Sequence, residues 1–329
     1  MRILFVGGTG IISSGCARRL VAEPGVELTL LLRGKTDRAV PAGVEVVKGD
    51  VRDPASLAAA LGRRTFDVVV NFIAFTTAHV QADIDFFGGR TAQYVFISSA
   101  SAYQTPPLRL PVTESTPLRN PVWGYSQDKI ACEDLLVRAY RERGFPATIV
   151  RPSHTYDPRT LPVHGGYTVI DRMRRGKPVV VHGDGSSLWV LTHHDDFAKG
   201  FNGLLGNPHV LGEAFHITSD ELLTWNQIHE YLATAAGVEA KLVHVPSATI
   251  AKYDPSWGDS LLGDKTHSMI FDNSKIKRVV PTFAALVPYA AGAREQLAWY
   301  DADPARKVVD PATDALMDTL VAAQARALG

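Results

Sequence analysis

The stretch that decides the fold is Arg2-Ile3-Leu4-Phe5-Val6 followed by Gly7-Gly8-Thr9-Gly10-Ile11-Ile12-Ser13. An apolar run that leads into a glycine-rich turn and then into a helical pattern predicts a strand, a tight turn and a helix N-terminus. Gly7 and Gly10 suit the turn and a close ligand approach, and Ser13 stands where a third glycine would allow close helix packing. Such a turn can present backbone amides to a pyrophosphate, although a purely structural turn is the alternative. The cofactor residues predicted here are Gly7, Thr9, Gly10, Ile11 and Ile12.

Apolar runs that alternate with helical patterns continue through the first 150 residues. The predicted strands are residues 2–6, 27–32, 44–48, 68–72, 94–97 and 147–150, and the predicted helices include 12–22, 54–60 and 125–143. Strands that alternate with helices are typical of βαβ units with right-handed crossovers. The pattern therefore predicts an α/β fold with a doubly wound, parallel Rossmann sheet.

The rhythm changes after Arg151, where proline, glycine and histidine become frequent. We therefore expect residues 1–152 to form a dinucleotide-binding domain and residues 153–329 to form mainly a smaller, C-terminal substrate lobe. Residues 214–217 are expected to return to the main sheet as a further strand. Residues 314–328 have the pattern of a terminal amphipathic helix, with Thr313 as its N-cap.

The composition excludes several classes of protein. Hydrophobic residues make up 46% and charged residues 21% of the 329 positions, as in globular proteins. The 34 Lys and Arg residues balance 34 Asp and Glu residues, so no general basic field attracts nucleic acid or an anionic membrane. We expect a small-molecule partner instead. Cys16 and Cys132 are expected to be buried, reduced thiols, and Gly7 interrupts any signal-peptide core, so a cytoplasmic location is expected.

The residues that follow the second and third predicted strands help to distinguish NAD from NADP as the cofactor. An NAD site usually places a carboxylate on the ribose 2′-hydroxyl near the end of the second strand. Here Arg33-Gly34-Lys35 follows that strand, and the first acid is Asp37. The cations favour NADP, with NAD and a merely solvated Arg33 as the alternatives. Asp50 and Val51, after the third strand, stand where an adenine ring would lie, although Asp50 could equally be a helix cap.

Tyr125 and Lys129 lie four residues apart on one predicted helical face. An ammonium near a phenol can stabilise the tyrosinate and bring its pKa toward useful acid–base work. Ser99 follows the fifth strand and could hold a substrate oxygen beside Tyr125. The spacing of four residues is weak evidence for a catalytic pair by itself. The order of glycine turn, serine and Tyr/Lys helix along the chain strengthens that evidence.

With these motifs the chain resembles the extended short-chain dehydrogenase/reductase superfamily, the NAD-dependent epimerase/dehydratase group. Further motifs that carry the resemblance are Arg151-Pro152-Ser153-His154-Thr155-Tyr156-Asp157-Pro158, Gly183-Asp184-Gly185, His193 and Asp195-Asp196. The resemblance implies that Ser99, Tyr125 and Lys129 form a catalytic triad, and that Lys129 also bonds the nicotinamide ribose. It further implies that residues 71–74 (with Phe72, Ile73 and Ala74) and residues 152–154 (with Pro152 and His154) line the nicotinamide, and that the protein is a homodimer.

The chain departs from that family in three places. Ala100 and Ser101 follow Ser99, so the carboxylate that dehydratases and decarboxylases place there is missing. Trp189 stands where sugar epimerases have an arginine for the nucleotide diphosphate, and Leu261 or Leu262 replaces a second arginine. An indole cannot make a guanidinium's bidentate phosphate contact. We therefore expect a substrate other than an ordinary nucleoside-diphosphate sugar, or a diphosphate held elsewhere. The candidates for holding it are Arg159, Lys265 and His267.

Side chains that could contact the substrate come from several segments. The candidates are Ser101, Trp123, His154, Tyr156 and Trp189, each with core packing as the alternative. The run His193-His194-Asp195-Asp196 could suggest metal ligands. Because adjacent residues point in different directions in regular structure, we expect a structural run and no metal.

These observations predict an NAD(P)-dependent epimerase that acts on a secondary hydroxyl of a sugar or sugar-like substrate. Tyr125 would take the hydroxyl proton while hydride leaves for nicotinamide, Ser99 would bond the same oxygen, and Lys129 would lower the tyrosine pKa. The first alternative is an NADP-dependent ketone or alcohol oxidoreductase. The second is a non-catalytic protein that senses dinucleotides or associates with RNA.

Overall fold

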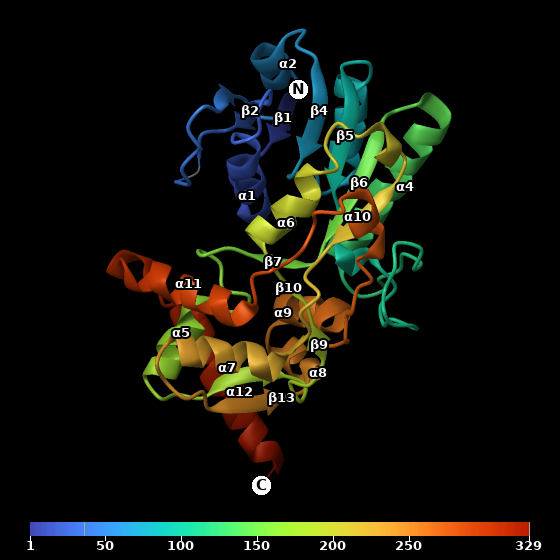
Figure 1. Cartoon of the computed structure of the whole chain (residues 1–329). Coiled ribbons are helices and arrows are strands. Elements are labelled where there is room, and N and C mark those ends of the chain that lie inside the picture. Colours follow the sequence, from blue (N-terminus) through green and yellow to red (C-terminus); the bar gives the residue numbers. More distant parts are fainter. Residues whose placement is uncertain (36, 329) are drawn as a thin grey trace.

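The order of strands in the central sheet places a switch point beside the glycine turn. The computed structural model describes residues 1–35 and 37–328. Its seven-stranded sheet has the order β11-β6-β5-β4-β1-β2-β3, and every neighbouring pair is parallel (Figure 1). The strands are β1 (Arg2–Val6), β2 (Glu27–Leu32), β3 (Glu45–Lys48), β4 (Phe66–Asn71), β5 (Thr91–Ile97), β6 (Ala147–Pro152) and β11 (Ala214–Ile217). The predicted doubly wound parallel sheet is confirmed, and the chain reverses direction across the sheet between β1 and β4.

Alternating side chains of each strand enter two different cores. Ile3 and Phe5 pack on the face covered by α1 (Ile11–Leu20) and α6 (His194–Asn202). Leu4 and Val6 pack on the opposite face, which is covered by α2 (Pro54–Leu61), α3 (Thr77–Phe87) and α4 (Gly124–Arg143). Burial on both faces explains why these strands are apolar runs rather than alternating ones. Cys16 and Cys132 are free and buried, one in each layer.

Small differences from the predicted boundaries have local causes. β3 starts at Glu45, and β4 ends at Asn71, so Phe72 lies in the loop that follows β4. The predicted cap of the last helix was wrong. The helix α12 (Pro311–Leu328) starts two residues before Thr313, because the Asp310 carboxylate accepts hydrogen bonds from the backbone N–H groups of Ala312 (3.1 Å) and Thr313 (3.3 Å).

A smaller lobe lies beyond the carboxyl ends of the sheet strands (Figure 1). Its helices are α5 (Tyr167–Arg174), α7 (Trp225–Ala235), α8 (Ser247–Tyr253), α9 (Pro255–Ser260), α11 (Tyr289–Asp301) and α12. Its short strands are β7 (His154–Tyr156), β8 (Val179–His182), β9 (Leu188–Trp189), β10 (Leu191–His193), β12 (Leu223–Thr224) and β13 (Leu242–Val245). The lobe has its own apolar core, in which Ile170, Val180 and Leu232 are buried. The smaller C-terminal lobe of the predicted fold is therefore present.

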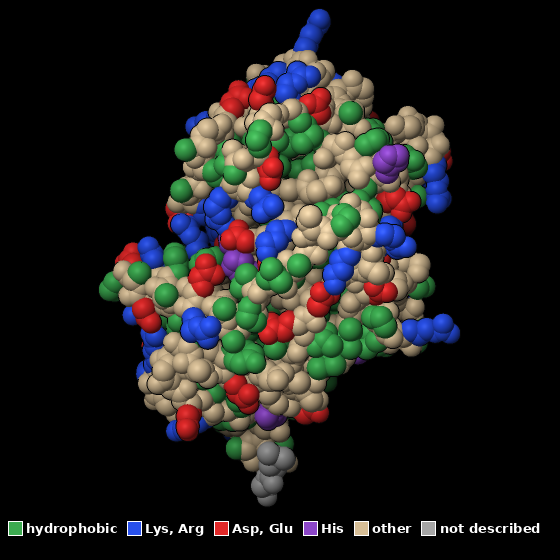
Figure 2. Space-filling view, viewed as in Figure 1, with side chains coloured by type: hydrophobic (Ala, Val, Ile, Leu, Met, Phe, Trp, Pro, Cys, Tyr) green, Lys and Arg blue, Asp and Glu red, His purple; other side chains and the backbone are tan. Residues whose placement is uncertain are grey.

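The surface carries no single dominant charge. Figure 2 shows acidic and basic side chains interspersed over the face in view, in keeping with the balance of 34 cationic and 34 anionic residues. Within residues 1–35 and 37–328, no helix combines the length and apolar composition that a membrane crossing requires.

Candidate active site

The glycine turn between β1 and α1 has the geometry of a dinucleotide-binding turn. Gly7 has a φ of +80°, and a Cβ at this position would lie 2.8 Å from Cγ2 of Ile73, so only glycine fits. The backbone N–H of Gly10 donates to Oγ of Ser13 at 2.8 Å. The close helix packing expected at Ser13 occurs instead at Gly15, where a Cβ would lie 2.8 Å from the carbonyl oxygen of His194. Ser13 therefore caps the helix, and Gly15 lets α1 approach α6.

A cavity of about 210 Å³ opens beside this turn at the ends of β1, β2 and β3. Six of the predicted cofactor residues line it, namely Gly7, Thr9, Arg33, Asp50, Val51 and Ile73. Its cations are Arg33 and Lys35, and its carboxylate, Asp50, accepts a hydrogen bond from the backbone N–H of Arg52 at 2.9 Å. Asp37 does not line the cavity; its side chain is 93% exposed and lies 3.7 Å from Arg159. The residues present thus fit a dinucleotide, and they place two cations and one carboxylate on the cavity wall.

The loop after β4 is held by three side chains. The backbone N–H of Ile73 donates to Oδ1 of Asn71 at 2.8 Å, and its carbonyl accepts a hydrogen bond from Arg52. The carbonyl of Ala74 accepts a hydrogen bond from Lys129 at 2.8 Å. These bonds fix the loop that, with the glycine turn, borders the dinucleotide cavity.

The other predicted cofactor residues lie outside the lining of this cavity. Ile11 and Ile12 form the first turn of α1, directly after Gly10. The ring of Phe72 packs against Phe5, with ring centroids 4.9 Å apart, so its side chain belongs to the core.

A second cavity, of about 240 Å³, lies at the carboxyl ends of β5 and β6; we call it the reaction cavity. It brings together Ser99, Ser101, Trp123, Tyr125, Pro152, His154 and Trp189, all predicted from the sequence as site residues. The other residues that line it are Ala100, Ser153, Asp264, Lys265 and Phe271. Parallel strands end at the same edge of a sheet, which explains how residues so distant in sequence meet here.

Hydroxyl groups are connected on one wall of the reaction cavity. Oγ of Ser99 lies 2.9 Å from Oγ of Ser101, which in turn accepts a hydrogen bond from Ser126 at 2.7 Å. Tyr125, at the start of α4, has its ring centroid 5.0 Å from that of Trp123. Hydrogen bonds therefore hold Ser99 and Ser101 in place, and the ring of Tyr125 packs against the indole of Trp123.

Lys129 is buried one helical turn beyond Tyr125. Its Nζ donates to the carbonyls of Ala74 at 2.8 Å and Ile97 at 2.7 Å, and it lies 5.8 Å from the centroid of the Tyr125 ring. Burial lowers the pKa of Lys129 to about 8. The ammonium therefore connects the loop after β4, at Ala74, with the carboxyl end of β5, at Ile97.

The pKa of Tyr125 is raised rather than lowered. Burial disfavours the phenolate most strongly, a hydrogen bond from Ser99 acts in the opposite direction, and the negative charge of Asp264 raises the pKa further. Lys129 is not among these causes, and its ammonium donates to the carbonyls of Ala74 and Ile97. The lowering of the Tyr125 pKa by Lys129 therefore stays a prediction.

Asp264 and Lys265 are the charged residues of the reaction cavity. They lie on η3 (Leu261–Lys265), and their charged groups are 3.5 Å apart. Burial raises the pKa of Asp264, and Lys265 acts in the opposite direction. The amide of Asn120 donates to the carbonyl of Gly263 at 2.6 Å and holds this turn against α4. Asp264 is a site residue that was not predicted from the sequence, because the expected carboxylate was one directly after Ser99.

Other predicted substrate residues lie outside the reaction cavity. Tyr156 is 1% exposed and packs against Tyr289, with ring centroids 5.2 Å apart, because α11 covers it. Of the three residues suggested for a diphosphate, only Lys265 lines the cavity, and its Nζ lies 5.2 Å from the ring centroid of Trp123. Arg159 faces Asp37, and His267 is half-buried elsewhere.

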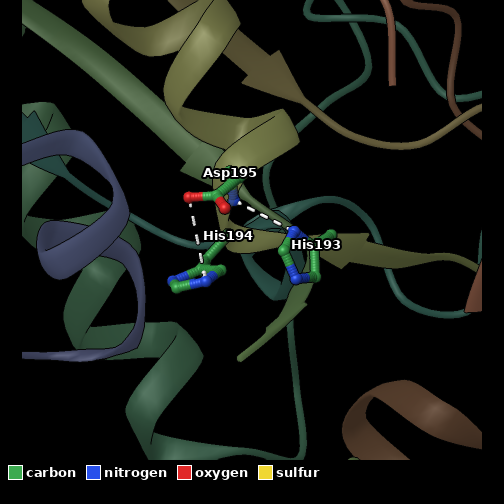
Figure 3. Close-up of side chains that lie close together, drawn as sticks. All are labelled: His193, His194 and Asp195. Atoms are coloured by element: carbon green, nitrogen blue, oxygen red, sulfur yellow. Dashed lines mark hydrogen bonds and ion pairs between the residues drawn. The ribbon is translucent and has the colours of Figure 1, made fainter. Parts of the chain in front are cut away.

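The side chains at the start of α6 form a cluster whose members already have protein partners. The potential ligand atoms of His193, His194 and Asp195 lie within 4.8 Å of one another (Figure 3). Asp195 forms an ion pair with Arg18, whose guanidinium also lies 3.3 Å from Nε2 of His194. Nε2 of His193 lies 2.9 Å from Glu295. A cation at this position would have to displace the guanidinium, so the cluster is best explained as the cap of α6.

The model of the NAD dependent epimerase/dehydratase family matches residues 3–217. The chain is 26% identical over 288 residues to the 2′-dehydrokanamycin reductase of Streptomyces kanamyceticus, covering 86% of this chain and 80% of that protein. It is 28% identical over 258 residues to the chloroplast stem-loop binding protein of 41 kDa b of Arabidopsis thaliana, covering 74% of this chain and 65% of that protein. A solved structure of UDP-glucuronic acid 4-epimerase from Bacillus cereus has a similar fold, with a TM-score of 0.71, 19% identity, and coverage of 93% of this chain and 100% of that chain.

Proposed function

Because the chain belongs to the NAD dependent epimerase/dehydratase family and is an enzyme of that family, we propose that it transfers hydride between a nicotinamide dinucleotide and a secondary carbinol or ketone of a sugar-like molecule. The observation that supports this most is that Ser99 and Tyr125 line one cavity with Pro152, at the same edge of the sheet as the dinucleotide cavity. Ligands of open α/β sheets bind at this edge, at the switch point of the strand order.

Each residue of the proposed triad has one task. Tyr125 gives a proton to the substrate oxygen in reduction and takes it back in oxidation. Ser99, fixed by Ser101 at 2.9 Å, donates a hydrogen bond to the same oxygen and stabilises the charge that develops there. Lys129 holds the loops at Ala74 and Ile97 and keeps a donor near the site of the nicotinamide ribose. The nicotinamide, when bound, supplies or accepts the hydride.

For the cofactor we propose NADP. Arg33 and Lys35 line the wall of the dinucleotide cavity that follows β2, and the only carboxylate among the residues lining it, Asp50, follows β3. Cations at this point attract a 2′-phosphate, and a guanidinium binds it with charge-assisted hydrogen bonds.

The proposed course is ketone reduction, with epimerisation as the second candidate. NADPH serves as an exchangeable reductant, and the printed activity of the Streptomyces kanamyceticus relative is also a reduction. Epimerisation is favoured by the family description and uses the same three side chains. Water elimination is less suited, because Ala100 and Ser101 follow Ser99 and the carboxyl of Asp264 faces Lys265 at 3.5 Å.

We further propose that residues 1–152 together with β11 bind the dinucleotide and that residues 153–329 supply most of the substrate wall. His154, Trp189, Asp264 and Lys265 support this division, since all of them lie in the second part and line the reaction cavity. A homodimer through α4, the helix of Tyr125 and Lys129, is part of the same proposal, and the molar mass in solution from light scattering tests it.

RNA association is the rival function, and the name of the Arabidopsis thaliana relative motivates it. The interspersed surface charges and the cavity that holds Ser99 and Tyr125 favour catalysis. A gel-shift titration with stem-loop RNA tests the rival, and binding that competes with NADPH would support it.

The proposal is tested with NADPH deuterated at C4 and a panel of keto sugars. The reductase course predicts loss of NADPH absorbance matched by deuterium in the product alcohol. The epimerase course predicts turnover of an alcohol without net change of the cofactor. Ketone reduction without deuterium transfer, or no hydride chemistry with any carbinol or ketone of the panel, would contradict the proposal.

A further inference from the structure

A third cavity, of about 210 Å³, adjoins the reaction cavity and shares His154 and Lys265 with it; we call it the distal cavity. Its other walls come from β8, α7, α9 and η3, with His182, His229, Trp225 and Trp257 among the lining residues. The chain has 5 tryptophans, and Trp123, Trp189, Trp225 and Trp257 line one or other of the two cavities. Ligand sites are commonly about 300–1,000 Å³, so each compartment by itself is small and the two together fall in that range.

Protein partners fix the tautomers of three histidines in the distal cavity. The indole N–H of Trp189 donates to Nδ1 of His154 at 3.1 Å, and because an indole is only a donor, the His154 proton must be on Nε2. His229 donates from Nδ1 to the carbonyl of Trp225 at 2.7 Å, which leaves a lone pair on Nε2. His182 donates from Nε2 to the carbonyl of Lys265 at 3.1 Å, which leaves a lone pair on Nδ1.

These histidines are neutral at physiological pH. Burial lowers the pKa of His154 to about 3 and the pKa values of His182 and His229 to about 4. These three histidines therefore offer one N–H donor and two lone pairs of fixed position. The indole N–H of Trp225 is also buried, with no partner in the described part of the chain. Uncharged donors and acceptors beside indole rings suit hydroxyl groups on a sugar ring.

The charges of the two cavities do not suit a diphosphate. Among their lining residues no arginine occurs, and Lys265, the one lysine, has its ammonium 3.5 Å from the carboxyl of Asp264. Phosphate oxygens are acceptors only, so the lone pairs of His182 and His229 would repel them. Hydroxyl and amino groups can donate to both lone pairs.

We propose that the distal cavity binds a second ring of the substrate, and that the substrate is a phosphate-free glycoside whose neighbouring ring reacts at Tyr125. This inference rests on the proposed function, because the reaction cavity defines where the reacting ring lies. His154 separates the two rings and contributes its Nε2–H, and Trp225 supplies a second donor. The site thus selects hydroxyl- or amino-bearing rings over nucleoside diphosphates.

The test is a titration of the NADP-loaded full chain followed by tryptophan fluorescence, with kanamycin, maltose, UDP-glucose and UDP as probes. We expect kanamycin or maltose to bind saturably, and Trp225→Phe, which keeps an aromatic ring but loses the N–H and the smaller ring of the indole, to weaken that binding about 10-fold. Trp299→Phe is the matched control, since Trp299 lines neither cavity, and should change the affinity less than 2-fold. His229→Asn is the second variant in case Trp225→Phe lowers the melting temperature.

The inference is overturned if UDP or UDP-glucose binds at micromolar concentration and both phosphate-free glycosides fail to bind. It is also overturned if the glycoside binds Trp225→Phe and His229→Asn as tightly as the parent protein. Tyr125→Phe separates this result from the proposed function. That variant should bind the glycoside normally and lose hydride transfer. If the parent protein binds the glycoside but shows no hydride transfer with any keto sugar, the proposed function fails and the binding result stands by itself.

Discussion

Replacing Lys129 by methionine should change the stability of the protein in a way that depends on pH. Burial lowers the pKa of Lys129 from 10.5 to about 8, a difference that corresponds to about 3 kcal/mol of destabilisation when the ammonium is charged. Methionine removes this cost but leaves the carbonyls of Ala74 and Ile97 without their bonds from Nζ, at roughly 1–3 kcal/mol each. The two effects offset each other, so we expect Lys129→Met to lower the free energy of unfolding by no more than about 3 kcal/mol at pH 7.

The pH dependence gives the sharper result. Between pH 8 and pH 10.5 the unfolded chain still binds the Lys129 proton while the folded chain has released it, so the stability of the parent protein rises with pH relative to Lys129→Met. The difference in unfolding free energy should grow by about 2 kcal/mol from about pH 7 to about pH 9.5, as measured by urea denaturation. Lys252→Met, at an exposed position, is the control and should show no such growth. A difference that stays flat or shrinks with pH would refute the assigned burial of a charged Lys129.

Three further predictions concern the pH profile, the cofactor and the packing of the lobe. Asp264→Asn removes a negative charge that raises the pKa of Tyr125, so the acid limb of the pH profile of kcat/KM for alcohol oxidation should move to lower pH, while Asp259→Asn, at an exposed position, should leave it in place. A shift to higher pH would contradict this assignment. Arg33→Ser removes a cation from the dinucleotide cavity and should lower the ratio of kcat/KM for NADPH to that for NADH by roughly 10-fold or more; an unchanged ratio would argue against a 2′-phosphate contact. Arg172→Met removes a fully buried guanidinium that contacts Asp314 at 2.5 Å and Asp318 at 2.7 Å, and should cost about 3 kcal/mol in urea unfolding, whereas the exposed Arg326→Met should cost almost nothing.

The parts of the fold and site that could be predicted from sequence are those set by local patterns. Apolar runs around Ile3 and Val68 marked strands buried on both faces, and the glycine turn marked the first crossover. Ser99 and Tyr125 could be placed together because one follows a strand and the other starts the next helix, at the same edge of the sheet.

The parts that could not be predicted depend on packing between distant segments. Asp264 reaches the reaction cavity because Gly263 lies against Trp123, so closely that a Cβ there would be 2.6 Å from the Trp123 Cβ. Tyr156 is removed from the cavity by α11, which passes over it at Gly292. Neither of these two close contacts follows a periodicity or a residue spacing, so neither could be predicted from the sequence.

The direction of the pKa shift of Tyr125 also could not be predicted from the sequence. The spacing of Tyr125 and Lys129 suggested an ammonium aimed at a phenol. The buried lysine instead bonds two carbonyls, because the loops at Ala74 and Ile97 end directly above it. Desolvation then dominates the pKa of Tyr125, and it acts in the direction opposite to the one expected.

The central claim is that the hydroxyl of Tyr125 exchanges the proton that accompanies hydride transfer. The most direct test is the single-turnover rate of NADPH oxidation by Tyr125→Phe with a ketone that the parent protein reduces. Loss of this one oxygen should slow the chemical step about 100-fold or more while leaving NADPH binding and the melting temperature unchanged. If Tyr125→Phe turns over at the parent rate, the proton comes from another group and the account of this site is wrong.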